Sequence, residues 1–345
     1  MVETSTEVAR ATSGCTGLDL ALGGGYGIGR ITSIAGLKST GKTQLAIETC
    51  AHFKNDYPKA KIYYVDAETA FDLSFAQFIG FPKEDVTLVR HHTVEDFERE
   101  TIAWINNLKG PKPAKGKEPA EEGDYAIVVL DSLDALGTKK EIETTVEDAA
   151  GFANARKAAI VSSIYKKLLT ATDGKNVAVV IIHQLRVNVS GYGALHLIAG
   201  GKAVELFGCA IVRDSKLKTL TKTIKGNVRA TGVRVKAYVE KNKLGLPFRE
   251  FEFTIQFHYG IDDIEASLSF LQDQGELARL PRELVMTVDK DNKEKLVEKV
   301  STVIDRLEKL DDLAFAENLK LLKKTTTDVW NEIEAGFTVT RRRKF

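Results

Sequence analysis

Residues 36–43 read Gly36-Leu37-Lys38-Ser39-Thr40-Gly41-Lys42-Thr43 and match G-x-x-x-x-G-K-[ST] at every fixed position. Glycines allow a loop backbone to come close to an anion, so that successive N–H groups cradle phosphates. In this pattern Lys42 reaches the β- and γ-phosphates, and the hydroxyl of Thr43 binds Mg²⁺. The sequence therefore predicts a site for a nucleoside triphosphate and Mg²⁺, and we include Gln44 in it.

The residues on either side of this loop favour a true phosphate site over a chance match. Arg30–Ala35 before the loop is strand-like, and Thr43–Ala51 after it has helical spacing. The loop therefore opens onto a helix N-terminus, where the backbone favours negative charge.

The bulk composition restricts the class of protein. With 345 residues, 43% of them hydrophobic, the chain can build one large core and a smaller domain. Its net charge of +1 means that any nucleic-acid binding must be local. Cys15, Cys50 and Cys209 are far apart, which argues against a disulfide framework or a zinc site and fits a reducing cytoplasm. We expect neither a signal peptide nor a membrane span.

Short β-branched segments alternate with helical ones over most of the chain. The expected strands are Lys61–Val65, Val86–Arg90, Ile127–Leu130, Val177–Ile182 and Cys209–Arg213, and the expected helices are Thr43–Phe53, Thr93–Leu108, Asp148–Ala171 and Ala199–Phe207. This alternation predicts an α/β fold with a mostly parallel sheet and helices on both faces. Val233–Lys241 and Phe251–Phe257 alternate apolar and polar residues and predict an antiparallel extension.

The C-terminal part has a different pattern. From about Asp262 the strand pattern stops, and Lys293–Leu310 and Asp311–Ala335 look helical. We therefore expect a short N-terminal segment (1–13), a core (14–262) and a small C-terminal helical domain (263–345).

Two of the expected strands end in carboxylates. Ile127–Leu130 leads into Asp131, the form of a Walker B element, so Asp131 is the expected partner of Mg²⁺. Ile62–Val65 leads into Asp66 and Glu68, and because parallel strands gather their C-terminal ends at one edge, both lie near the ligand. Glu68 is our candidate for orienting and deprotonating the attacking water, with Asp66 as the competitor.

A further strand, Val177–Ile182, ends in His183 and Gln184. Gln184 is placed to contact the γ-phosphate and report its presence. His183 is isolated from other metal-ligand types, so we interpret it as structural.

The motifs occur together in a recognisable order. They are Leu18–Gly25, the phosphate loop, Asp66–Asp72, Asp131–Leu136, His183–Arg186, Gly200–Ala203 and Lys241–Lys243. This is the order seen in RecA-type recombinases, and the chain resembles the bacterial RecA and phage UvsX branches over roughly residues 14–260. Lys139-Lys140-Glu141 is more similar to the phage branch.

The resemblance implies roles for residues of the nucleotide site. Glu68 becomes the catalytic carboxylate, Gln184 couples the γ-phosphate to DNA binding, and Asp72 and Phe75 lie against the adenine. Tyr259 joins the residues that bind the nucleotide. Lys241 and Lys243 reach the ATP of a neighbouring subunit, as an arginine finger does elsewhere.

The resemblance also implies two loops that face DNA, about residues 141–150 and 186–200. The second contains Tyr192, Leu195 and Ile198, apolar groups that could insert between bases, although a partly buried loop would explain them too. The expected DNA-binding residues are Arg186, Asn188, Ser190, Gly191, Tyr192, Gly193, Leu195, Gly200, Gly201 and Lys202.

The chain departs from the family pattern at both ends. The helix and strand that precede the core in RecA and dock onto the next subunit are expected to be missing. We expect the helix Asp311–Ala335 and an edge strand at 337–340 to serve assembly instead. We expect the basic residues 341–344 to form a tail in place of the acidic tail of the bacterial protein.

The sequence thus predicts a cytoplasmic, DNA-dependent ATPase that forms helical filaments on single-stranded DNA and pairs it with homologous duplex DNA. Single-strand-binding and loader proteins are further expected partners. The alternatives are a hexameric helicase built on the same core, and a mediator that binds ATP or DNA without hydrolysis.

Overall fold

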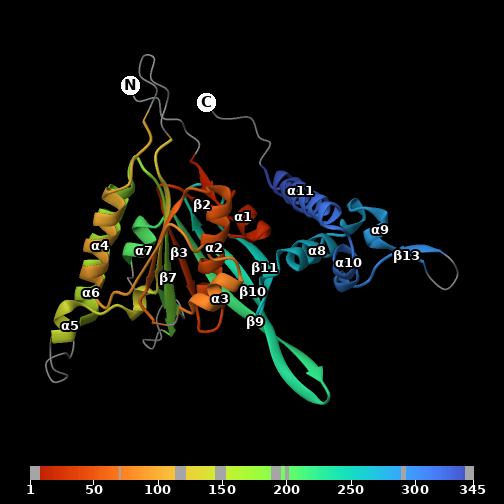
Figure 1. Cartoon of the computed structure of the whole chain (residues 1–345), viewed down its shortest axis with the longest axis horizontal. Helices are drawn as coiled ribbons and strands as arrows, with labels where there is room; N and C mark the ends of the chain where they lie inside the picture. Colours follow the sequence, from red (N-terminus) through yellow and green to blue (C-terminus); the bar gives the residue numbers. More distant parts are fainter. Residues whose placement is uncertain are drawn as a thin grey trace.

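A computed structural model describes residues 8–69, 71–112, 122–143, 153–187, 196–198, 202–288 and 293–338. A large twisted sheet forms its centre (Figure 1). In spatial order the strands are β12 (Gly260–Ile261), β11 (Arg249–Gln256), β10 (Asn227–Asn242), β9 (Ala210–Ile224), β3 (Ile31–Gly36), β7 (Asn176–Val187), β6 (Tyr125–Asp131), β4 (Lys61–Asp66) and β5 (Val86–Val89). The strands from β9 to β5 are parallel, and β10, β11 and β12 add on antiparallel, which confirms the predicted α/β fold.

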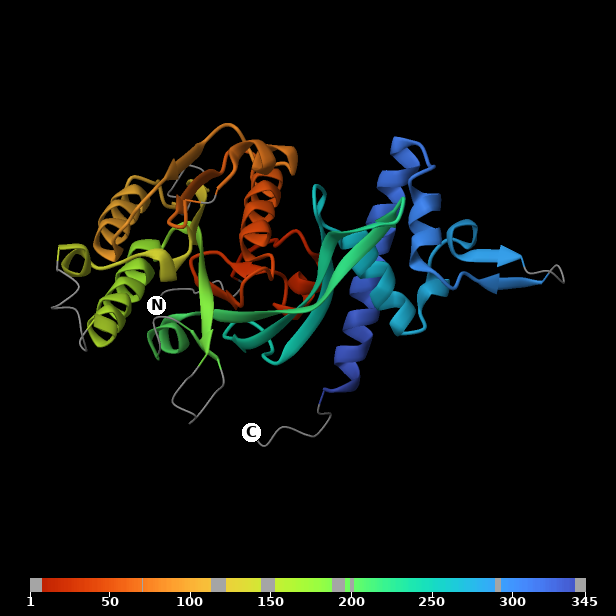
Figure 2. The same ribbon diagram turned by 90° about the horizontal axis from the view of Figure 1, so that it is seen from below.

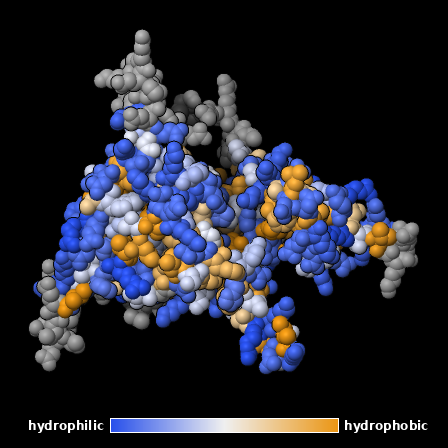
Figure 3. All heavy atoms as spheres, viewed as in Figure 1, coloured by the Kyte–Doolittle hydropathy of each residue, from blue (hydrophilic) through white to orange (hydrophobic). Residues whose placement is uncertain are grey.

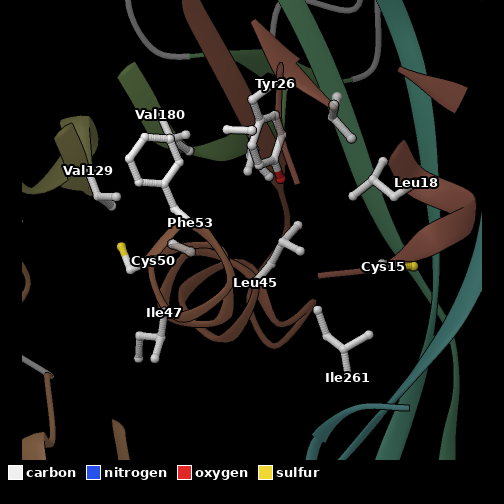
Figure 4. Packing of buried hydrophobic residues seen from close by; sticks show 14 of the residues in the cluster. Cys15, Leu18, Tyr26, Leu45, Ile47, Cys50, Phe53, Val129, Val180 and Ile261 are labelled. Carbon is white, nitrogen blue, oxygen red and sulfur yellow. The ribbon is translucent and has the colours of Figure 1, made fainter. Parts of the chain in front are cut away.

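Helices cover both faces of this sheet. One face carries α1 (Thr16–Ala21), α2 (Lys42–Asp56) and α3 (Leu73–Phe78); the other carries α4 (Val94–Asn106), α6 (Ala153–Thr172) and α7 (Lys202–Phe207). Because side chains alternate along a strand, Ile127 and Val129 pack on the α2 side and Val128 and Leu130 on the α4 side. Figure 4 shows Phe53 and Leu45 of α2 in the first of these two cores.

Short elements complete this part of the chain. They are β1 (Arg10–Ala11), β2 (Tyr26–Gly27), the 3₁₀ helix η1 (Leu133–Ala135), α5 (Lys139–Glu143) and β8 (His196–Ile198). β1 pairs with β2, and β8 pairs with the end of β7.

Strands β9 and β10 continue far beyond the sheet as a two-stranded arm, residues 216–231, which projects downward in Figure 1. Sequence analysis missed this length, because the arm has no apolar face and its strands pair only with each other. Its turn is Lys225-Gly226, with φ of 49° and 79°. Positive φ at both turn residues matches the right-handed twist of the two strands.

The C-terminal residues pack around a core of their own, to one side of the sheet (Figure 2). Their elements are α8 (Asp263–Asp273), the 3₁₀ helix η3 (Leu277–Arg279), α9 (Arg282–Val285), β13 (Met286–Val288), β14 (Glu294–Leu296), α10 (Val300–Leu307) and α11 (Asp312–Gly336). Trp330 of α11 packs against Phe251 of β11, so this helix also contacts the central sheet.

The structure corrects two expectations here. The expected helix over Lys293–Leu310 begins only at Val300, and the residues before it form the β13–β14 hairpin, so strands do not stop at Asp262. Phe337 caps α11 and Thr338 follows in a bend rather than a strand; residues 339–345 lie outside the described part of the chain. Helical spacing of a few apolar residues cannot exclude a short hairpin.

Candidate active site

The phosphate loop joins β3 to α2, as its flanking sequence predicts. Gly41 has a φ of +83°, and a Cβ there would lie 2.0 Å from Cδ1 of Ile255. Gly36 ends β3, and a Cβ there would lie 2.6 Å from Oγ1 of Thr40. Gly36 is therefore required by the loop itself, and Gly41 by its own backbone conformation and by Ile255 of β11, which packs against the loop.

Lys42 begins α2 with its amino group directed into the curve of the loop. Its side chain is largely buried, and Nζ donates to the carbonyl oxygens of Gly36 (3.0 Å) and Leu37 (2.8 Å). Burial lowers the pKa of Lys42, and the carboxylates of Asp214 and Asp131 oppose this shift. A cation is thus held where the phosphates of a nucleotide would lie.

Asp131 ends β6 beside the hydroxyl of Thr43. Its carboxylate is hydrogen-bonded to the Thr43 side chain and accepts from the Tyr64 hydroxyl at 3.0 Å. Burial raises the pKa of Asp131 to about 6, the Thr43 bond opposes this shift, and the charge of Glu68 adds to it. A divalent cation would relieve this crowding of negative charge, and hydroxyl and carboxylate oxygens are ligands that Mg²⁺ accepts.

Glu68 follows β4 and is hydrogen-bonded to a residue that follows β6 and to a residue of β7. Its Oε1 accepts hydrogen bonds from Oγ of Ser132 (2.6 Å) and Nε2 of Gln184 (2.8 Å). The competing carboxylate, Asp66, is buried, lies 3.5 Å from Nε of Arg90 and accepts from the backbone of Phe71. The geometry favours Glu68 as the acid that faces the loop.

A cavity of about 500 Å³ contains these groups. Its lining comprises Lys38, Ser39, Gly41, Lys42, Thr43, Gln44, Ile47, Glu68, Phe71, Asp72, Phe75, Asp131 and Gln184. Asp72 also caps α3 by accepting from the Phe75 backbone N–H. Neighbouring strands β3, β7, β6 and β4 thus each deliver a predicted residue to one edge, as parallel strands do.

Comparison with known proteins identifies this arrangement. The RecA N-terminal domain family matches residues 2–108 and 115–262. The RecA protein of Nautilia profundicola is 34% identical over 257 residues, covering 74% of this chain and 67% of the relative. That of Sulfurovum sp. is 31% identical over 260 residues, covering 74% and 68%.

The chain belongs to the RecA family. It is a RecA-type recombinase of homologous recombination and repair, an ATP hydrolase that uses ATP with Mg²⁺. At the family level it binds single-stranded DNA and forms filaments. The matched region spans about two thirds of each RecA relative.

The two lysines expected at a RecA subunit boundary do not line the cavity. Lys243 donates to the carbonyl of Leu206 at 3.1 Å, and Lys241 donates to the carbonyl of Glu205, both in the last turn of α7. Cations are stabilised at this end of a helix. Tyr259 also lies elsewhere, 58% exposed in the turn between β11 and β12, where it lines a second hollow. In a single chain, these three predicted nucleotide contacts are therefore not brought together with the others.

Only part of the expected DNA surface of this RecA-type chain lies within the described residues. Arg186, near the end of β7, and Lys202, at the start of α7, are exposed. Asn188, Ser190, Gly191, Tyr192, Gly193, Leu195, Gly200 and Gly201 lie outside the described residues.

Several residues at the RecA-type site were not singled out from the sequence. The hydroxyl of Tyr64 donates to Asp131 and that of Ser132 donates to Glu68, and the sequence motifs that contain these two residues indicate no role for them. Asp134 bonds the backbone of Gln184, and Asp214 lies beside the phosphate loop. A carboxylate two residues after the apolar run Ala210–Val212 was the one available signal for Asp214.

Two further observations concern metals and membranes. His183 is buried between Tyr165 (3.1 Å) and Oγ of Ser33 (3.2 Å), as a structural histidine would be. Among the described residues, no cluster of three His, Cys, Asp or Glu side chains could hold a metal.

No described helix combines the length and apolar character needed to cross a bilayer.

Proposed function

We propose that the chain polymerises on single-stranded DNA with one ATP bound between neighbouring subunits, and that it exchanges this strand with homologous duplex DNA. The observation that carries this proposal is the meeting of Lys42, Asp131, Glu68 and Gln184 in one cavity. The separation of Lys241 and Lys243 from that cavity supports a role in trans, toward the ATP of the next subunit.

The predicted nucleotide-site residues have distinct chemical tasks in this proposal. The backbone of the phosphate loop and Lys42 hold the phosphates, and Thr43 and Asp131 hold Mg²⁺, which neutralises charge on the phosphate oxygens. Glu68 orients water and accepts its proton. Asp72 and Phe75 contact the adenine, and Tyr259 contacts nucleotide only once subunits assemble.

Gln184 links the two activities. Its side chain bonds Glu68, and it lies on the strand that leads to the segment 186–200. A γ-phosphate in the cavity would compete for this amide, so ATP changes the position of the residues that hold DNA. Arg186, Lys202 and the predicted residues between them bind the phosphates of single-stranded DNA.

The arm supplies a second basic surface, for the duplex. It carries Lys216, Lys218, Lys222, Lys225 and Arg229, all exposed, with no Asp or Glu from Ser215 to Val239. Within the described residues, these five cations make no ion pair. In Figure 3 the arm, at the bottom, is mostly hydrophilic. Such a concentration of one charge favours a polyanion.

Other finer assignments remain proposals. We place the protein in the cytoplasm, with single-strand-binding and loader proteins as partners, and in the phage-like branch of the family. We propose residues 263–345 as a separate domain, supported by their own core and by the end of the family match at residue 262.

Electron microscopy tests the proposal directly. The full chain, single-stranded DNA and a slowly hydrolysed ATP analogue should give helical filaments, and adding homologous duplex with ATP should give strand exchange. Closed hexamers that unwind a forked duplex would establish the helicase alternative instead. ATP or DNA binding with no DNA-stimulated hydrolysis would establish the mediator.

A further inference from the structure

Asp134 lies in η1, between the nucleotide cavity and the start of the DNA-facing segment. Its side chain is only 7% exposed. Oδ2 accepts a hydrogen bond from the backbone N–H of Gln184 at 2.7 Å, and Oδ1 lies 3.4 Å from Nε of Arg186. One carboxylate therefore contacts both the residue that bonds Glu68 and the first basic residue of the DNA-facing segment.

Asp134, Gln184 and Arg186 line a hollow of about 440 Å³. This hollow shares Glu68 and Gln184 with the nucleotide cavity. Arg186 is on its rim with 60% of its side chain exposed. Its guanidinium is accessible to an incoming phosphate, but part of its charge is already balanced by Asp134. A DNA phosphate approaching Arg186 would meet the negative charge of Asp134 just behind it.

We infer that Asp134 is a positioning residue that holds Arg186 in a DNA-free arrangement and ties that arrangement to Gln184. The inference rests on the proposed contact of Arg186 with DNA. The carboxylate opposes DNA binding in the absence of nucleotide. When nucleotide moves Gln184, the backbone N–H that anchors Oδ2 moves too, and the hold on Arg186 is released. Asp134 thereby makes DNA affinity depend on ATP.

The test compares Asp134→Asn with wild type in the full chain. The asparagine keeps an oxygen that can accept from Gln184 N–H but loses the charge. We expect affinity for a labelled oligo-dT, measured by fluorescence anisotropy, to rise about fivefold without nucleotide. With a slowly hydrolysed ATP analogue the gain should be much smaller, so the ratio of the two affinities falls. Asp134→Glu should restore the wild-type ratio.

The matched control is Asp124→Asn. Asp124 also accepts from a backbone N–H, that of Lys109 at 2.8 Å, and pairs with Lys61 at 3.1 Å, but it lies before β6, at the opposite edge of the sheet. Its replacement changes the net charge equally and should leave the ratio of DNA affinities with and without the ATP analogue unchanged. A fivefold gain in this control would overturn the inference, because the effect would then be one of net charge alone.

Arg186→Gln separates failure of the inference from failure of the proposed DNA contact. If Arg186→Gln weakens DNA binding and Asp134→Asn strengthens it only when Arg186 is present, the inference holds. If Arg186→Gln weakens binding but Asp134→Asn does not strengthen it, the inference is overturned and the DNA contact stands. If Arg186→Gln has no effect, both are overturned. Asp134→Ser, which also removes the charge, replaces Asp134→Asn should the latter unfold.

Discussion

Asp214 of β9 lies opposite Gly36 of β3, so that a buried carboxylate is adjacent to the phosphate loop. Its side chain is 2% exposed, and among the described residues neither oxygen has a hydrogen-bond partner. Burial raises the pKa of Asp214 from the ordinary 3.8 to about 7, and the charge of Lys42 opposes this shift. An unsatisfied buried charge is costly, so ionised Asp214 destabilises the folded chain.

The first prediction concerns the pH dependence of this cost. Because the folded-state pKa lies above the unfolded one, ionisation of Asp214 lowers the stability of the folded chain. This loss is absent below about pH 4, grows between about pH 4 and 7, and is complete above about pH 7. Asp214→Asn should therefore stabilise the nucleotide-free protein at pH 8, by at most about 4 kcal/mol, with a gain that shrinks toward pH 5. Urea unfolding at pH 5, 6.5 and 8 measures this. An equal gain at all three values would contradict it.

The second prediction concerns the shape of the phosphate loop. Gly41→Ala should lower the free energy of unfolding by roughly 1–2 kcal/mol because of the positive φ, and by a further 1–3 kcal/mol or so because Ile255 is displaced. Gly174→Ala is the control, because Gly174 has a φ of +67° and no atom within 4 Å of the added Cβ. Thermal and urea unfolding should show a clearly larger loss for Gly41→Ala. Equal losses would mean that the contact with Ile255 is relieved at no cost.

The third prediction concerns which of two carboxylates, Glu68 or Asp66, acts as the general base. Glu68→Gln should retain ATP binding but lower the rate of DNA-stimulated hydrolysis by about 10²–10⁴-fold, because a general base is removed. Asp66→Asn should mainly weaken the contact with Arg90 and lower stability. Single-turnover hydrolysis and nucleotide binding on both variants decide the matter. If Asp66→Asn is the variant that binds ATP and fails to hydrolyse it, the roles are reversed.

The fourth prediction tests the action of Lys241 and Lys243 across a subunit boundary. A Lys241→Ala, Lys243→Ala double variant should bind ATP but hydrolyse it poorly on DNA, and Lys42→Ala should be inactive by itself. Mixing the two inactive proteins should restore part of the ATPase activity, because an intact phosphate loop then meets intact lysines at mixed boundaries. If the lysines act within their own chain, mixing restores nothing.

The fifth prediction concerns the arm. Replacing Lys218, Lys222 and Lys225 by Gln should weaken binding to duplex DNA and reduce the slope of log K against log salt by roughly 0.9 for each DNA phosphate that the variant no longer neutralises. ATP hydrolysis without DNA should be unchanged, because the arm is remote from the cavity. The matched control replaces three exposed lysines of the C-terminal residues, Lys309, Lys320 and Lys324, by Gln, which changes the net charge equally. An unchanged salt slope would exclude the arm from duplex binding.

Local patterns in the sequence were sufficient for the fold and for the chemical parts of the site. The phosphate loop needs glycine at position 36 because of Thr40 and at position 41 because of a positive φ, and its motif was readable from the chain. Asp131 and Glu68 follow apolar strands, and parallel strands place such residues at one edge. Sequence analysis could therefore predict that Lys42, Asp131, Glu68 and Gln184 meet.

Tertiary structure decided what depends on partners distant in the sequence. It turned Asp66 toward Arg90 and Glu68 toward Gln184, extended β9 and β10 into an arm, and replaced the start of an expected helix by the β13–β14 hairpin. It also placed Asp214 beside Gly36 and Asp134 between Gln184 and Arg186. A carboxylate has the same local sequence signature whether it faces a cation, a backbone N–H or nothing, because its energy is set by neighbours that only the folded chain supplies.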